Sequence, residues 1–463
     1  MTRNVRIVSP VDGSIVAERP LADDAALDAA LAAAREAQRA WRATPIPARA
    51  EILTRAVDAM LAMADEIVPE LAWQMGRPVR YGMGELRGFE ERARHMIAIA
   101  EEALAPIRPE AMEGFTRFIA RGPLGTVLVI APWNYPFLTA VNSIVPALMA
   151  GNAVVLKHAT QTLLVGERFA QAFAKAGLPE GLFANLVLSH TQAARAIGSG
   201  LVHQVNFTGS VEGGRAMEAA ASGRFIGVGL ELGGKDPAYV RADADLEHAI
   251  ETLVDGAMFN SGQSCCGIER IYVEEAVYDR FVEGAVALTR GYVLDTPLDE
   301  ATTLGPMVTA AGADFVRGQV AEAVRAGASA LIDPAAFPRD AAGSTWMAPQ
   351  IVVDVDHSMS LMCEESFGPV VGIMKVRGED EAIRLMNDSD YGLSAAIFTR
   401  DLEAAARIGA ALETGTVFAN RCDYLDPALA WTGVKNTGRG ATLSRLGYET
   451  LTRPKSFHLR HPG

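Results

Sequence analysis

The chain has 463 residues, 49% of them hydrophobic, which indicates a globular protein of two or three domains. Acidic residues number 56 against 42 basic ones, and the formal net charge of −14 argues against nucleic acid or an anionic membrane as a partner. The longest apolar runs are too short to span a bilayer, and the four cysteines lack the spacing of a disulfide framework, so we expect a cytoplasmic protein.

The N-terminal region is predicted to be helical. Apolar residues recur at helical spacing over residues 23–41 and again over 48–76, so two long amphipathic helices are expected to open the chain. A third helix is predicted over 81–105, where acidic and basic residues alternate on what is most simply a solvated face. We assign that charged face no function.

Short β-rich runs separated by helical segments follow from Gly125 onward. The first block contains five such runs, at residues 126–130, 153–156, 183–188, 202–207 and 226–230. Apolar strands that alternate with helices predict a parallel sheet covered on both faces, which makes the fold class α/β. Such sheets bind ligands at the carboxyl ends of their strands.

A second block of strand-like runs predicts a second α/β domain. These runs lie at residues 270–273, 370–375, 394–399 and 416–420. Two further segments, 115–121 and 455–460, have strand-like patterns and no neighbour in the sequence, so we expect them to pair with each other. Their exposed edges would invite pairing with another subunit.

The most informative stretch is Phe-Asn-Ser-Gly-Gln-Ser-Cys-Cys at residues 259–266. A thiolate is the strongest nucleophile that a side chain supplies near neutral pH, and backbone N–H groups after a small polar turn stabilise it. Cys265 is therefore a candidate nucleophile. For a cysteine taken alone, a buried apolar role is the more frequent alternative.

Two strand ends carry polar side chains that suit acyl chemistry. The first strand runs into Pro-Trp-Asn-Tyr-Pro at 132–136, where Asn134 is placed either to donate a hydrogen bond to an oxyanion or to cap the next helix. Glu231 ends another apolar strand, where burial raises a carboxyl pKa and makes a usable base. A salt bridge is the alternative role for Glu231.

Signals for a dinucleotide are weaker. Lys157 ends a strand, where its ammonium either reaches ribose hydroxyls and phosphates or is simply solvated. The segment 208–214 opens a helix whose free N–H groups suit a pyrophosphate, although an ordinary turn has the same sequence. The chain has no Gly-x-Gly-x-x-Gly fingerprint, and the Gly-x4-Gly-Lys run at 229–235 continues with Asp236, so we treat it as a false Walker match.

These segments, together with Glu-Glu-Ser-Phe-Gly-Pro at 364–369, resemble the motifs of the aldehyde dehydrogenase superfamily in the family's order. The family's Asn-x-Gly-Gln-x-Cys signature identifies Cys265, not Cys266, as the nucleophile. The resemblance implies that Asn134 and the Cys265 backbone N–H hold the oxyanion, and that Glu231 activates water. It also implies oxidation of an aldehyde to a carboxylic acid through a thiohemiacetal and a thioester.

The resemblance further implies a Rossmann-type cofactor domain, a second α/β catalytic domain and a β oligomerisation arm. The expected boundaries are 1–104 with 124–235 for the cofactor-binding domain, 236–440 for the catalytic domain, and 105–123 with 441–463 for the arm. In the family the arm joins subunits, so a homodimer or homotetramer is expected.

The cofactor that the resemblance implies is NAD or NADP. The residues that match the family's cofactor positions are Trp133, Lys157, Thr160, Gly209, Ser210, Gly214, Leu232, Glu365 and Phe367. Glu365 is expected to grip the nicotinamide ribose while Phe367 packs nearby, whereas most such acidic pairs are merely turns. Thr160 stands where the family usually has a glutamate, and loss of that charge predicts turnover with both cofactors.

Several alternatives concern the chemistry itself. The eight histidines show no ligand spacing, so no catalytic metal is expected. A CoA-acylating semialdehyde dehydrogenase is disfavoured by Glu231, which such relatives generally lack, and a catalytically silent NAD-binding homologue is disfavoured by the complete set of Asn134, Glu231 and Cys265. Cys266 either packs passively or takes part in a reversible oxidation. Residues 421–426, which line the substrate mouth in the family, do not identify the aldehyde.

Overall fold

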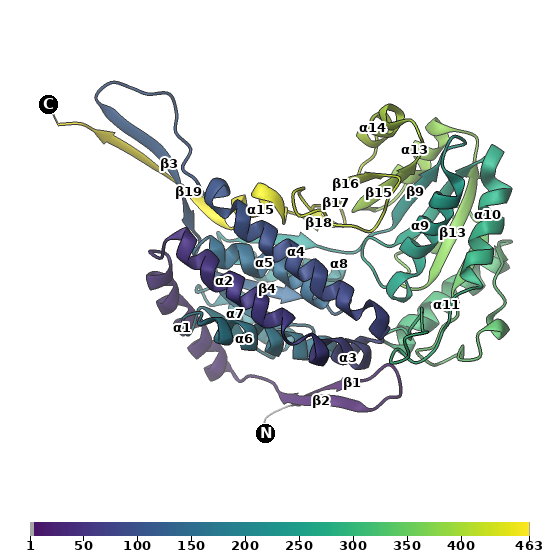
Figure 1. The fold of residues 1–463 in the computed structure, drawn as a ribbon, viewed down its shortest axis with the longest axis horizontal. Helices are drawn as coiled ribbons and strands as arrows, with labels where there is room; N and C mark the ends of the chain where they lie inside the picture. The colour runs from purple at the N-terminus through teal and green to yellow at the C-terminus, as the bar shows by residue number, and fades with distance from the viewer. Residues whose placement is uncertain (1–3, 463) are drawn as a thin grey trace.

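The computed structural model describes residues 4–462 and consists of two layered α/β regions, each built on its own sheet, with a two-stranded arm that projects from the body (Figure 1). The N-terminal helices are α1 (Asp24–Trp41), α2 (Ile46–Leu61), α3 (Ala64–Met75) and α4 (Val79–Ala103). They pack beside the first sheet and carry the N-terminal hairpin of β1 (Asn4–Val8) and β2 (Ile15–Pro20) below it.

The prediction of one helix over 48–76 is wrong, because the chain leaves helical geometry between α2 and α3. Met63 has φ −100° and ψ 14°, and its side chain is buried in the core at the break. The prediction that the charges of the third helix lie on a solvated face is also partly wrong. Glu85 and Arg92 of α4 are 1% and 7% exposed, so they belong to the interior.

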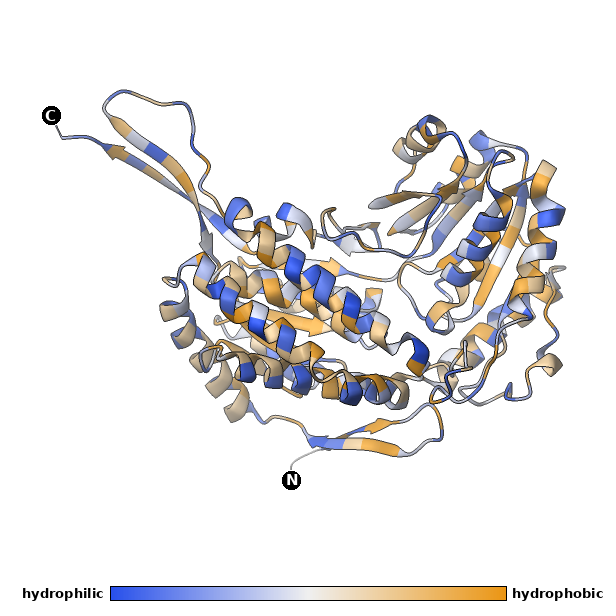
Figure 2. Ribbon diagram, viewed as in Figure 1, coloured by the Kyte–Doolittle hydropathy of each residue, from blue (hydrophilic) through white to orange (hydrophobic). Residues whose placement is uncertain are grey.

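The first sheet has the strand order β18-β8-β7-β4-β5-β6. Its strands are β4 (Thr126–Ala131), β5 (Ala153–His158), β6 (Phe183–Asn185), β7 (Gln204–Thr208), β8 (Gly227–Glu231) and the antiparallel β18 (Gly438–Arg439). The helices that alternate with them are α5 (Pro136–Met149), α6 (Leu163–Ala176), α7 (His190–Gly198) and α8 (Val211–Ala221). Every residue of β4 is buried, as expected for a strand covered on both faces, and Figure 2 shows the central strands in hydrophobic colours.

The second sheet has the order β11-β12-β13-β10-β9-β15-β16 and is parallel except for its first pair. Its strands are β9 (Asp236–Val240), β10 (Ile268–Glu274), β11 (Ser329–Ala330), β12 (Gln350–Val353), β13 (Val370–Val376), β15 (Ser394–Phe398) and β16 (Thr416–Ala419). The longer helices around it are α9 (Leu246–Met258), α10 (Glu275–Thr289), α11 (Ala310–Arg325), α13 (Glu379–Asn387) and α14 (Leu402–Ala410). The two sheets are joined directly, because β8 ends at Glu231 and β9 begins at Asp236.

The arm consists of β3 (Phe115–Pro123) and β19 (Thr452–Arg460), which pair antiparallel over their whole length. The Phe118 and Phe457 rings stack across the pair with centroids 4.4 Å apart. The predicted pairing of these two segments is therefore confirmed. Helix α15 (Ser444–Glu449) leads from the first sheet into β19 and anchors the arm through the buried Tyr448, whose hydroxyl donates to the Met96 carbonyl at 2.5 Å.

Candidate active site

The candidate nucleophile, Cys265, follows a tight turn that contains three residues with positive φ. The turn is the 3₁₀ segment η2 (Phe259–Gly262), in which Asn260 and Ser261 have φ of 54° and 55°. Gly262 also has a positive φ, and a Cβ there would meet the Gly368 carbonyl oxygen at 2.0 Å, so glycine is required. The turn places Cys265, half-buried, on the wall of a cavity of about 470 Å³.

Asn134 is buried in the loop that follows β4, and its side chain faces the same turn. Its Nδ2 donates to the Gln263 carbonyl at 3.2 Å, two residues before the thiol. The alternative of a helix cap is wrong, because the carboxylate of Glu85 accepts the Phe137 and Leu138 N–H groups of α5 at 2.9 and 3.0 Å. The Asn134 amide is thus directed at the cysteine turn.

Arg77 fixes this loop against the turn. Its Nη2 donates to the Asn134 carbonyl at 2.7 Å and its Nε to Asn260 Oδ1 at 3.3 Å. Arg77 also forms a buried ion pair with Glu85 and lies over the Tyr135 ring at 4.6 Å. One guanidinium therefore joins α4, the loop after β4 and the turn before Cys265.

Glu231 lines the same cavity as Cys265 and is held by two hydroxyl groups. Thr208 Oγ1 donates to its Oε2 at 3.0 Å and Thr442 Oγ1 to its Oε1 at 2.5 Å. No ion pair to Glu231 forms within residues 4–462, so the salt-bridge alternative is wrong. Burial raises the pKa of Glu231, and the two hydroxyl donors and Arg92 oppose that rise.

The expected nicotinamide end of the cofactor site is formed by segments from both sheets. The Trp133 and Phe367 rings meet edge to face with centroids 5.6 Å apart. Glu365 accepts a hydrogen bond from the Gly234 N–H at 2.9 Å, while Glu364 is exposed. Burial, with a contribution from the nearby Glu269, raises the pKa of Glu365 to about 8.

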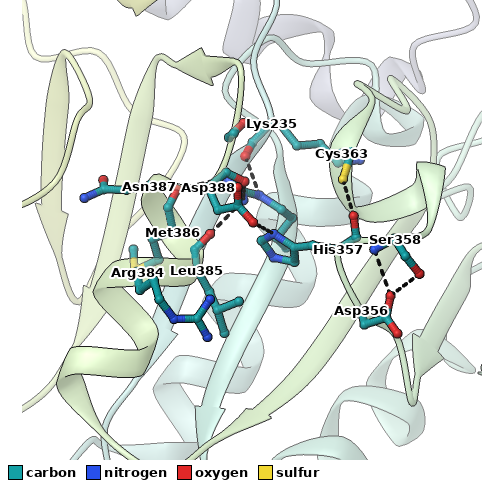
Figure 3. A network of polar contacts seen from close by, with 12 residues as sticks. Lys235, Asp356, His357, Ser358, Cys363, Arg384, Leu385, Met386, Asn387 and Asp388 are labelled. Carbon is teal, nitrogen blue, oxygen red and sulfur yellow. Dashed lines mark hydrogen bonds and ion pairs between the residues drawn. The ribbon is translucent and has the colours of Figure 1, made fainter.

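The segment that carries Glu365 rests on a buried polar network in the second region. Lys235 Nζ donates to Glu269 Oε2 at 2.5 Å and to Ser366 Oγ at 3.0 Å, and Arg270 Nε donates to the Lys235 carbonyl at 2.9 Å. At its outer end Tyr272 hydrogen-bonds His357, whose Nδ1 lies 2.7 Å from Asp388 Oδ2; Figure 3 shows this histidine facing the aspartate. The network therefore anchors Ser366, the residue that follows Glu365.

The expected adenosine end lies at the carboxyl end of β5. Lys157 is buried, and burial lowers its pKa. No carboxylate pairs with it within the described part of the chain, so its charge is available to an anionic or hydroxyl ligand, and the solvated alternative is wrong. Thr160 is exposed at the start of the 3₁₀ segment η1 (Thr160–Thr162).

The expected pyrophosphate site is the N-terminus of α8. Ser210 is the N-cap, and its hydroxyl accepts the Gly213 N–H at 3.1 Å. Gly209 lies tight against its surroundings, since a Cβ there would meet the Phe207 ring at 2.8 Å. A Cβ on Gly214 would meet the Leu232 side chain at 2.7 Å, so the helix packs closely on the chain after β8. The free N–H groups of this helix end fit a dinucleotide phosphate.

A model of the aldehyde dehydrogenase family matches residues 1–457 of this sequence. The chain belongs to this family. It is 34% identical over 456 residues to a succinate-semialdehyde dehydrogenase [NADP(+)] of Mycobacterium avium, covering 98% of this chain and 96% of the relative. It is also 34% identical to the succinate semialdehyde dehydrogenase [NAD(P)+] Sad of Escherichia coli, over 95% of this chain and 94% of that one.

Solved structures agree with this assignment. The NADP-dependent glyceraldehyde-3-phosphate dehydrogenase of Bacillus halodurans, complexed with NADP, has a TM-score of 0.93 and 31% identity, covering 99% of this chain and 96% of that one. The aldehyde dehydrogenase described here oxidises an aldehyde to a carboxylic acid with NAD or NADP. The predicted family, fold class, reaction class and cofactor are thereby confirmed.

Two features are absent from the described residues. No helix within residues 4–462 is both long and apolar enough to cross a bilayer. In the same part of the chain, no three His, Cys, Asp or Glu side chains gather in a group that could hold a metal ion.

The site of this aldehyde dehydrogenase contains residues that the sequence did not single out. Arg77, Glu85, Arg92, Thr442 and Asp423 all contact candidate catalytic residues or line the cavity. The first three lie in or just before a helix whose interleaved charges look like a solvated face. Thr442 follows the Gly-Arg-Gly segment near the C-terminus, where nothing local marks a partner for Glu231.

Proposed function

We propose that this aldehyde dehydrogenase works through a covalent thioester on Cys265, which water activated by Glu231 hydrolyses. The observation that carries this proposal is that the two side chains line one cavity, although they come from different sheets. The cavity also holds apolar and aromatic side chains, including Leu138 and Trp431, which suit the carbon skeleton of an aldehyde.

In this proposal Cys265 Sγ attacks the aldehyde carbon and forms a thiohemiacetal. The developing oxyanion is held by the Asn134 amide and the Cys265 backbone N–H, and such a donor is typically worth ~10²–10³ in rate. Bound NAD or NADP supplies the oxidation by accepting a hydride. Glu231 then takes a proton from the water that attacks the thioester, and the acid leaves as the thiol re-forms.

The proposed cofactor contacts lie at the nicotinamide end, at the adenosine end and at the N-terminus of α8. Glu365 holds the nicotinamide ribose, with Phe367 and Trp133 beside it. Lys157 and Thr160 face the adenosine ribose. The remaining proposed cofactor contacts, Gly209, Ser210, Gly214 and Leu232, form or abut the N-terminus of α8.

We also propose a division of the chain and an assembly. Residues 1–104 with 124–235 form the cofactor-binding domain, 236–440 the catalytic domain, and 105–123 with 441–463 the arm. The arm joins subunits of a homodimer or homotetramer. A cytoplasmic location suits a reaction that needs a reduced cysteine.

The substitution Cys265→Ala tests the nucleophile. It should abolish NAD(P)H formation with any aldehyde while leaving the thermal unfolding midpoint close to that of the wild type. Cys363→Ala is the matched control, because Cys363 is an exposed free cysteine outside the cavity, and it should keep full activity. Wild-type turnover by Cys265→Ala would show that the nucleophile lies elsewhere.

The CoA-acylating reaction is the second candidate, and it predicts that turnover requires CoA. If water resolves the thioester, mixing enzyme and NAD(P) with an aldehyde gives a burst of NAD(P)H and free acid without CoA. A strict requirement for CoA would replace the hydrolytic proposal, and absence of the burst would favour a silent homologue. A screen of aliphatic, aromatic and semialdehyde substrates then identifies the aldehyde.

A further inference from the structure

The carboxylate of Asp423 contacts both neighbours of the proposed nucleophile. Its Oδ1 atom accepts hydrogen bonds from Cys266 Sγ at 2.8 Å and from Ser264 Oγ at 3.2 Å. Asp423 lines the same cavity as Cys265. A single carboxylate oxygen therefore accepts hydrogen bonds from the residues on both sides of Cys265.

The loop that carries Asp423 is fixed at several points. Asn420 Oδ1 accepts the Thr399 N–H at 3.0 Å, and its Nδ2 donates to the Thr399 carbonyl at 2.9 Å. On the other side, the Tyr424 hydroxyl donates to Glu91 Oε1 of α4 at 2.8 Å. Asp423 has φ 46°, a conformation that aspartate adopts more readily than most residues. Its carboxylate is thus a rigidly placed acceptor.

The chemistry of this contact assigns the protons. Cys266 must carry its proton in order to donate to Asp423. A hydrogen bond with the Cys265 side chain, together with burial and the Asp423 charge, raises the pKa of Cys266. Burial also raises the pKa of Asp423, while its two hydrogen-bond donors and the nearby Arg92 and Arg77 lower it. In the observed geometry the Cys266 thiol and the Ser264 hydroxyl are the donors and Asp423 Oδ1 is the acceptor.

We infer that Asp423 is a positioning residue that selects Cys265 as the nucleophile, because it holds Cys266 as a hydrogen-bonded thiol and fixes the cysteine turn through Ser264. This inference rests on the proposed function, in which Cys265 attacks the aldehyde. It explains how two adjacent cysteines give one reactive thiol, and Asp423 itself forms no bond to the substrate.

The test is alkylation of the full-length enzyme by iodoacetamide, with the labelled residue assigned by peptide mass spectrometry. We expect label on Cys265 alone in the wild type and on both cysteines in Asp423→Ala. The same variant should lose kcat at least about tenfold, the effect of removing hydrogen bonds to a charged group, with a smaller change in KM. Asp426→Asn is the matched control, because Asp426 lies on the same loop and its carboxylate accepts only the Ala428 N–H, and it should keep the wild-type labelling.

A second pair of variants decides the question even if Asp423→Ala fails to fold. Cys266→Ser keeps a donor for Asp423 and should retain kcat within about twofold, whereas Cys266→Ala removes the donor and should lose about tenfold. Equal kcat values in these two variants, or labelling of Cys265 alone in Asp423→Ala with wild-type kcat, would overturn the inference. Wild-type enzyme labelled only at Cys266 would instead refute the proposed nucleophile, so the two failures are distinguishable.

Discussion

Glu231 is held between effects that act on its pKa in opposite directions. Burial raises the pKa, whereas the Thr442 and Thr208 hydroxyls stabilise the charged form. A general base works only when it is deprotonated, so thioester hydrolysis should fall as the pH drops through the raised pKa of Glu231. The loss should begin at a higher pH than an ordinary glutamate would give.

The substitution Thr442→Val tests this balance with almost no change in volume. Removing the 2.5 Å hydrogen bond should let the pKa of Glu231 rise further and move the acidic limb of kcat upward by about one pH unit. The burst of NAD(P)H should persist, because it precedes hydrolysis. Thr450→Val is the control, since that hydroxyl donates to the Gly447 and Ala441 carbonyls. An acidic limb that stays in place would contradict this role for Thr442.

Thr160 is expected to affect the choice between NAD and NADP. A glutamate at this position would repel a 2′-phosphate, and like charges brought together cost several kcal/mol, so Thr160→Glu should raise KM for NADP by one or more powers of ten. KM for NAD should change much less. Thr160→Gln supplies the same length without the charge and should leave NADP turnover largely intact. Wild-type enzyme with no detectable NADP turnover at millimolar concentration would refute this account.

The arm is the element whose structure most clearly calls for a partner. A two-stranded ribbon has little core of its own and is marginally stable alone in water, yet β3 and β19 extend away from the body (Figure 1). Most residues of β19 are exposed, and its backbone edge is free to pair. We therefore expect another subunit to cover the arm.

Deletion of residues 455–463 tests this expectation by removing most of β19. The shortened enzyme should become monomeric, as measured by light scattering coupled to gel filtration, because the remaining strand cannot hold the ribbon. Phe225→Ser is the control, since Phe225 is a fully exposed aromatic residue (109%) outside the arm. A deletion variant with the wild-type mass would place the subunit interface elsewhere.

At the scale of the whole molecule, the Arg77–Glu85 ion pair connects the N-terminal helices with both sheets. Both side chains are buried, at 2% and 0% exposure, and breaking such a pair leaves an uncompensated charge inside the protein. Arg77→Met should therefore lower the free energy of unfolding by about 3–5 kcal/mol, measured by urea denaturation. Adding Glu85→Gln should recover part of that loss, and a single variant as stable as the wild type would show that the pair is dispensable.

The sheets were predictable where their strands are buried on both faces. The residues of β4 form a continuous apolar run, because neither face meets water. The N-terminal hairpin of β1 and β2 was missed, because both strands are short, β2 lacks an alternating pattern, and only Ile7 of the two strands is buried. The break at Met63 was missed for the opposite reason, because apolar periodicity continues across it.

The proposed catalytic residues stand in local motifs, whereas the residues that hold them do not. Cys265, Asn134 and Glu231 follow strands or turns whose sequences suggest chemistry. The contact of Asp423 with Cys266 cannot be predicted from the local sequence, because folding brings Asp423 from a distant loop to the cysteine turn. The same holds for Arg77, which lies in the link between α3 and α4 and becomes buried only once the neighbouring layers are in place.

The direct passage from β8 to β9 has a mechanical consequence. Glu231 is the last residue of one sheet's strand, and Asp236 begins a strand of the other, so residues 232–235 are a short covalent link between the two sheets beside the proposed reacting centre. Lys235, at the far end of this link, is anchored by Glu269 and Ser366. Any rotation of the two regions that widens the cavity would thus swing Glu231 away from Cys265. A movement that opens the cavity for ligands would then also separate the proposed base from the proposed nucleophile.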